Sequence, residues 1–156
     1  MKIKTREIAS AFFAGGFAVF CAISPTLGND EGKVNAVTLN IGALEHAKEL
    51  IKQGYVAADG RGGWSEHQPS RSEENEFIRL HGFGEYAKWH LGIDDRYAEN
   101  TKQRYKFPYG DFKNVHRCGV LAAQSRAGQY NYFDIENAAV QLKTMIATTR
   151  EAHVKR

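Results

Sequence analysis

The chain has 156 residues, of which 42% are hydrophobic and 25% are charged, so its composition excludes a disordered chain and fits one ordinary domain. Its 21 basic and 18 acidic residues leave a formal charge of +3, an excess too small for a dedicated nucleic-acid binder, and nucleic acid is not an expected partner. Its two cysteines, Cys21 and Cys118, exclude a disulfide framework and a multi-cysteine metal site.

Residues 1–28 have the layout of a secretory signal peptide or a membrane anchor. Basic residues precede the uncharged run from Ile8 to Ile23, and polar residues follow it. As a helix this run spans roughly 24 Å, which is short of the ~30 Å hydrocarbon core of a bilayer unless residues 24–27 join it. Cleavage after Gly28 and a retained anchor over residues 8–27 therefore both stay open.

The basic residues at the start predict that the N-terminus stays in the cytoplasm. We therefore expect the domain to lie outside the cytoplasm, either anchored to the membrane or periplasmic or secreted after cleavage. If the segment is retained, Gly15 and Gly16 are candidates for close packing against a membrane partner.

Residues 29–38 are polar and predict a tether, although Val34–Leu39 allows one short strand. The first helix of the body is predicted over Ile41–Gln53, because apolar residues recur at helical spacing, and Gly54 ends it. The segment Tyr55–Ser70 is rich in glycine and predicts a loop, which Trp64 pins to the core.

A second helix is predicted to start near Ser70 or Ser72 and to run to a break at Gly82, with three apolar residues facing inward: Phe77, Ile78 and Leu80. A further short helix is predicted over Gly84–Leu91, followed by a loop or frayed helix over 94–103.

The aromatic run Tyr105–Phe112 contains Pro108 and Gly110 and predicts a rigid turn laid over apolar surface. Two helices, Val115–Gly128 and Asp134–Thr149, are then predicted to form an antiparallel hairpin, with Asp134 as an N-cap. The sequence therefore predicts an all-α domain of about five helices over residues 39–150, with a tail over 151–156.

The six histidines show no pair at metal-ligand spacing on one helix, so the sequence predicts no metal and no other cofactor: His46, His67, His81, His90, His116 and His153. His81, His90 and Glu85 converge only if the chain folds back at 82–84.

The residues with the chemistry for nucleophilic catalysis do not form a convincing set. Cys118 and His116 are two residues apart on a predicted helix and so point to different faces, and Cys118 fits better as a small core residue. The run 106–117 mixes basic and aromatic residues and allows base stacking, but a solvated aromatic turn is the simpler interpretation. The pattern leans against an enzyme without excluding one.

Three blocks of the body carry a family resemblance: ALEHAKELIKQG, then WSEHQPSRSEENEFIRLHGFGEYAKWHLGID, then TKQRYKFPYGDFKNVHRCGVLAAQSRAGQYNYFDIENAA. From Leu39 onward the chain resembles a family of small uncharacterised bacterial helical proteins, related regions of which occur in phage prohead-protease-like proteins. The resemblance implies a compact helical unit that behaves as an interaction module.

The preferred interpretation is a non-catalytic accessory or structural protein that docks its helical domain on a protein partner in a membrane or envelope complex. Five tyrosines are the predicted partner surface: Tyr97, Tyr105, Tyr109, Tyr130 and Tyr132. Two alternatives stay open. One is a phage-derived structural protein, and the other is a small-ligand-binding protein or enzyme with a pocket lined by His81, Glu85, His90 and His116.

Overall fold

The computed structural model describes residues 36–154, with side chains described over 36–150. The predicted signal or anchor over residues 1–28, with Gly15 and Gly16, lies outside this part of the chain. The described elements follow in this order: β1 (Val37–Leu39), α1 (Ile41–Gln53), β2 (Val56–Ala57), α2 (Trp64–His67), α3 (Arg71–Ala87), β3 (His90–Asp94), the 3-10 helix η1 (Lys102–Arg104), β4 (Tyr105–Pro108), β5 (Val115–His116), α4 (Arg117–Gln129) and α5 (Phe133–Val154). Among these residues no helix combines the length and the apolar character needed to cross a bilayer.

The prediction of an all-α domain is wrong, because the described residues form two small sheets beside their helices and the fold is mixed α/β. Only the short strand allowed within Val34–Leu39 was foreseen, and it forms as β1. The other strands are two to five residues long. Strands this short contain too few positions for an alternating pattern to stand out in the sequence.

The larger sheet has the order β1-β3-β4 and is antiparallel throughout. Val37 pairs with Asp94 on one side of β3, and His90 pairs with Pro108 on the other. The smaller sheet joins β2 to β5 in parallel, with Val56 opposite Val115.

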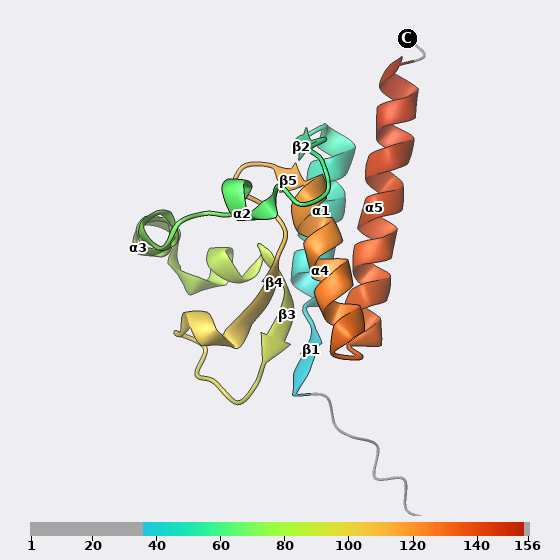
Figure 1. Ribbon diagram of the computed structural model, residues 1–156. Helices are drawn as coiled ribbons and strands as arrows, with labels where there is room; N and C mark the ends of the chain where they lie inside the picture. Colours follow the sequence, from blue (N-terminus) through green and yellow to red (C-terminus); the bar gives the residue numbers. More distant parts are fainter. Residues whose placement is uncertain (1–35, 155–156) are drawn as a thin grey trace, which may run out of the picture. The chain divides into compact units, whose positions relative to one another are not determined.

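Helices α1 and α4 each pack against α5 on one side of the larger sheet (Figure 1). The predicted apolar stripe of α5 is confirmed, since Ile135, Leu142 and Ile146 are buried in the common core. Helices α4 and α5 form the predicted hairpin, which places two apolar faces against each other. Helix α4 starts at Arg117 because His116 is still extended, and α5 starts one residue before Asp134, which lies in its first turn.

Helix α1 has the predicted bounds, and its two ends explain why. The side chain of Asn40 accepts a hydrogen bond from the backbone N–H of Ala43, as an N-cap does. Gly54 takes a left-handed φ of 86°, which ends the helix and suits glycine.

Helix α3 is interrupted at Gly82, where φ is 79°, so the predicted break is confirmed. Leu80 is 58% exposed, and its predicted inward orientation is wrong. The short helix expected over Gly84–Leu91 is also wrong at its end, because α3 stops at Ala87 and His90 begins β3. The expected turn over 105–112 begins as strand β4, because Tyr105 and its neighbours pair with β3.

Candidate functional site

Four of the five tyrosines predicted as a partner surface line one groove: Tyr97, Tyr105, Tyr130 and Tyr132. Tyr97 and Tyr130 are exposed at 41% and 58%. Tyr109 is fully buried and belongs to the core, so it takes no part in this surface.

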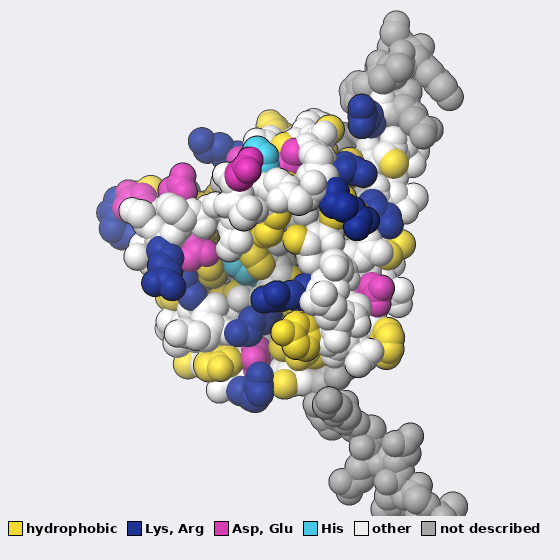
Figure 2. All heavy atoms as spheres, in the orientation of Figure 1, with side chains coloured by type: hydrophobic (Ala, Val, Ile, Leu, Met, Phe, Trp, Pro, Cys, Tyr) yellow, Lys and Arg dark blue, Asp and Glu magenta, His cyan; other side chains and the backbone are white. Residues whose placement is uncertain are grey.

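The groove, which we call the tyrosine groove, lies between β4 and one face of α4 and has a volume of about 820 Å³. Strand β4 contributes all four of its residues. Helix α4 contributes Ala122, Ser125, Arg126 and Gln129, which follow one helical face. Figure 2 shows Lys and Arg side chains beside hydrophobic ones on the face where β4 and α4 lie next to each other.

Three cations line the tyrosine groove together with a single carboxylate, that of Asp94, which forms an ion pair with Arg96. Arg96 donates two hydrogen bonds of 2.8 Å to the buried Asp94, and these bonds lower the pKa of Asp94. Lys106 lies 5.0 Å from the ring centroid of Tyr97, and Arg126 lies 6.0 Å from that of Tyr130. Neither of these two cations forms an ion pair with another described residue. The groove therefore presents positive charge between aromatic rings.

Strand β4 is also an edge strand, because within the described residues it pairs only with β3. One row of its backbone groups therefore has no strand partner. Such an edge can accept an extended peptide, with side-chain pockets adding selectivity.

The four residues of the predicted His/Glu pocket do not converge on one site: His81 and Glu85 lie on α3, His90 on β3 and His116 on β5. His81 is exposed on α3 against the ring of Phe77, and Glu85 pairs with Lys88 at 2.7 Å. His90 is buried in β3 and donates from Nδ1 to the Tyr86 carbonyl oxygen at 3.0 Å. His116 lies on β5 and faces a different set of partners, so no hydrogen bond, ion pair or ring contact joins any two of the four.

The closest polar partner of His116 is Asp59, which comes from the loop after β2. In the parallel pairing Ala57 lies opposite His116, and Asp59 and Cys118 each follow two residues after this pair. The backbone N–H of Cys118 donates to Asp59 Oδ1 at 2.6 Å, which continues the alignment of the two segments. The pairing of β2 with β5 thus places the Asp59 carboxylate beside the first turn of α4.

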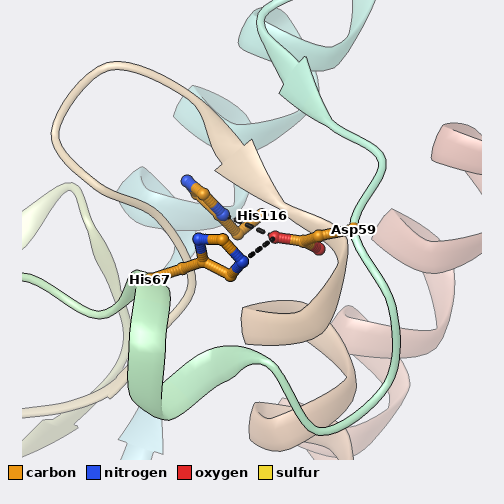
Figure 3. A group of neighbouring side chains, drawn as sticks. All are labelled: Asp59, His67 and His116. Atoms are coloured by element: carbon orange, nitrogen blue, oxygen red, sulfur yellow. Dashed lines mark hydrogen bonds and ion pairs between the residues drawn. The ribbon is translucent and has the colours of Figure 1, made fainter.

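Three polar side chains lie around the second carboxylate oxygen of Asp59. Asp59 Oδ2 lies 2.6 Å from His116 Nδ1, 3.9 Å from His67 Nε2 and 3.0 Å from Cys118 Sγ. Figure 3 shows both imidazole rings lying next to this carboxylate, one from β5 and one from α2. Burial opposes ionisation of Asp59, but the hydrogen bonds from Cys118 and His116 outweigh it and lower its pKa. We call Asp59, His67 and His116 the histidine cluster.

Cys118 is not an activated nucleophile in this arrangement. Burial and the hydrogen bond to Asp59 raise the pKa of its thiol to about 12, so the sulfur keeps its proton. The sequence predicts Cys118 and His116 on one helix, pointing to different faces. His116 is instead extended, and both side chains meet at Asp59.

The sequence assigns no role to Asp59 and dismisses His67 as a metal ligand together with the other histidines. It also does not predict that three cations join the tyrosines in one groove: Arg96, Lys106 and Arg126. Asp59 and His67 are eight positions apart in a glycine-rich loop and are far from His116, so no local spacing marks them. The only available signal was chemical, since the loop holds an acid and a histidine in a segment without helical period.

Comparison of the chain with protein-family models, curated protein sequences and solved structures finds no match. The family resemblance of residues 39–150 therefore stays a prediction.

Proposed function

We propose that this chain is a non-catalytic binding module, and that its tyrosine groove docks an acidic, extended segment of a partner protein. One observation carries the proposal: four exposed or half-buried tyrosines converge with three cations on a single groove. Tyrosine and arginine are the side chains that most often dominate binding energy at protein interfaces.

The charges of the tyrosine groove favour an acidic segment as its ligand. Arg96 is paired with Asp94, but Lys106 and Arg126 have no carboxylate partner among the described residues, so an acidic segment supplies the missing charges. The open edge of β4 adds backbone groups that suit an extended peptide. Base stacking is less favoured, because Lys106 and Arg126 already lie against the rings of Tyr97 and Tyr130.

The test measures binding of fluorescent peptides to the full-length chain in mild detergent by anisotropy. One peptide alternates glutamate with apolar residues, and its counterpart carries lysine in place of glutamate. We expect only the acidic peptide to bind. Lys106→Glu and Arg126→Glu should each weaken binding at least about tenfold, because an attractive contact becomes repulsive.

Lys52→Glu is the matched control, since Lys52 is exposed at the end of α1 and does not line the groove. Its affinity should equal that of the wild type. Equal binding by Lys106→Glu, Arg126→Glu and wild type would contradict the proposal, as would tighter binding of a single-stranded oligonucleotide than of the acidic peptide.

We further propose that the partner belongs to a membrane or envelope complex. This part depends on the predicted N-terminal segment and not on the groove. A chain without residues 1–28 should leave the membrane fraction yet still bind the acidic peptide. Membrane association that persists without these residues would contradict the predicted anchor and leave the groove proposal intact.

A further inference from the structure

We propose that the histidine cluster binds a divalent transition-metal ion of the zinc type. The proposal is independent of the tyrosine groove. It starts from the ligand atoms of Asp59, His67 and His116, which all lie within 4.8 Å of one another. These atoms come from a loop, the short helix α2 and strand β5, so the tertiary structure alone assembles them (Figure 3).

The distances fit a small metal centre. Two ligand atoms of a tetrahedral zinc site, each ~2.1 Å from the metal, are about 3.4 Å apart. The two histidine nitrogens lie 2.6 Å and 3.9 Å from Asp59 Oδ2, which brackets that separation. His67 follows a glycine-rich loop and its side chain is 42% exposed, so it has room to adjust.

The donor set indicates which ion would bind. Two imidazoles and one carboxylate suit Zn²⁺ and similar first-row ions, whereas Mg²⁺ and Ca²⁺ prefer oxygen ligands throughout. Three protein ligands would leave a fourth position for a water molecule.

The surroundings hold the ligands in place. Asp59 Oδ1 is fixed by the backbone N–H of Cys118, while Oδ2 faces the two histidines and the Cys118 thiol. His116 is buried, and its Nε2 lies 3.3 Å from Asp111 Oδ2. Asp111 is fixed in turn by the backbone N–H groups of Lys113 and Asn114. A carboxylate behind a ligating histidine orients the ring and strengthens it as a donor.

The test uses the full-length chain, purified without a polyhistidine tag and treated with a chelator. Titration with Zn²⁺, followed by calorimetry and by competition with a chromogenic chelator, should show one ion bound per chain. Bound Co²⁺ should give the intense visible absorption of a tetrahedral centre, and Mg²⁺ should not compete.

Asp59→Asn and His67→Ala should each weaken Zn²⁺ binding by at least the ~10–100-fold that changes behind a ligand produce. His67 is exposed, so His67→Ala should keep the wild-type circular dichroism spectrum and melting temperature. His81→Ala is the matched control, because it removes an exposed histidine outside the cluster, and its affinity should not change.

The alternative is a structural clamp, in which His116 only bridges Asp59 and Asp111. Absence of Zn²⁺ binding by the wild type would establish that alternative and overturn the proposal. Binding that both Asp59→Asn and His67→Ala retain at full affinity would overturn it as well.

Discussion

The hydroxyl group of Tyr109 donates a hydrogen bond of 2.6 Å to the carbonyl oxygen of Lys88. The same oxygen atom of Tyr109 lies 3.2 Å from the carbonyl oxygen of Ala43 in α1. The residue that follows β4 thus reaches both the end of α3 and the first turns of α1, with its ring wholly buried. A tyrosine that the sequence suggested for a partner surface is therefore a central element of the core.

Tyr109→Phe should lower the free energy of unfolding by about 1–2 kcal/mol, because a buried carbonyl group loses its donor. Urea denaturation followed by circular dichroism measures this change. Tyr97→Phe is the control, since Tyr97 is exposed, and its effect should stay within ~0.5 kcal/mol. Equal stability of the two variants would argue against the Tyr109–Lys88 hydrogen bond.

Gly119→Ala should destabilise the domain by about 1–3 kcal/mol through overpacking. A Cβ atom at this position would lie 2.9 Å from the ring of Trp64 and 2.9 Å from the backbone oxygen of Tyr109. Gly84→Ala provides the contrast, because nothing lies within 4 Å of its added Cβ in α3. It should leave stability unchanged or raise it by ~0.5–1 kcal/mol. The melting temperature should therefore fall for Gly119→Ala and stay the same or rise for Gly84→Ala.

Asn40→Ala should cost more than removal of an exposed N-cap. The amide nitrogen of Asn40 donates to the carbonyl oxygens of Ala87 and His90 at 2.9 and 3.1 Å, in addition to the capping bond. We expect a loss of about 2–4 kcal/mol, against about 0.5–1 kcal/mol for Ser70→Ala at the exposed cap of α3.

Asn40→Asp sharpens this test. It keeps the capping oxygen but places a carboxylate against the carbonyl oxygens, so it should be no more stable than Asn40→Ala at neutral pH. Full stability of Asn40→Asp, measured by urea denaturation, would show that the cap alone matters.

His90 should make the stability depend on pH. Burial lowers the pKa of His90 from 6.5 to about 4. The unfolded chain therefore binds more protons than the folded one between about pH 6.5 and pH 4. The contribution of neutral His90 to the free energy of unfolding is present above this window and is lost as the pH falls through it. Between pH 7.5 and 4.5 the wild type should lose about 2–3 kcal/mol more than His90→Gln. Parallel stability profiles of the two proteins would contradict this assignment.

The sequence predicted the helices whose apolar residues recur over several turns. Helices α1 and α5 have such stripes, and α1 also has Gly54 after its last turn, so these elements lie close to where the pattern placed them. The predicted helix over Gly84–Leu91 includes the first two residues of β3, because they follow the apolar and aromatic residues of α3 without a period of their own. The extended form of β3 depends on pairing with β1 and β4, which local sequence does not encode.

The two candidate sites likewise combine residues that the sequence marks with residues that only tertiary packing brings together. The sequence marks the tyrosines by residue type, since aromatic side chains supply contact area at interfaces. Their meeting with Lys106 and Arg126 depends on the packing of α4 against β4. Asp59 and His67 carry no mark in the sequence, and His116 is predicted beside other partners. A loop, the short helix α2 and a two-residue ladder bring the three residues together.

That ladder also bears on the order of folding. Helices α4 and α5 are neighbours in the chain, so their hairpin closes a short loop and pays a small entropic cost. Strands β2 and β5 are separated in the chain by α2, α3 and two strands of the larger sheet, and their contact closes a far longer loop for only two paired residues. We therefore expect the segment around Asp59 to join the native structure late and to open first under native conditions, where hydrogen exchange would detect it ahead of the C-terminal hairpin.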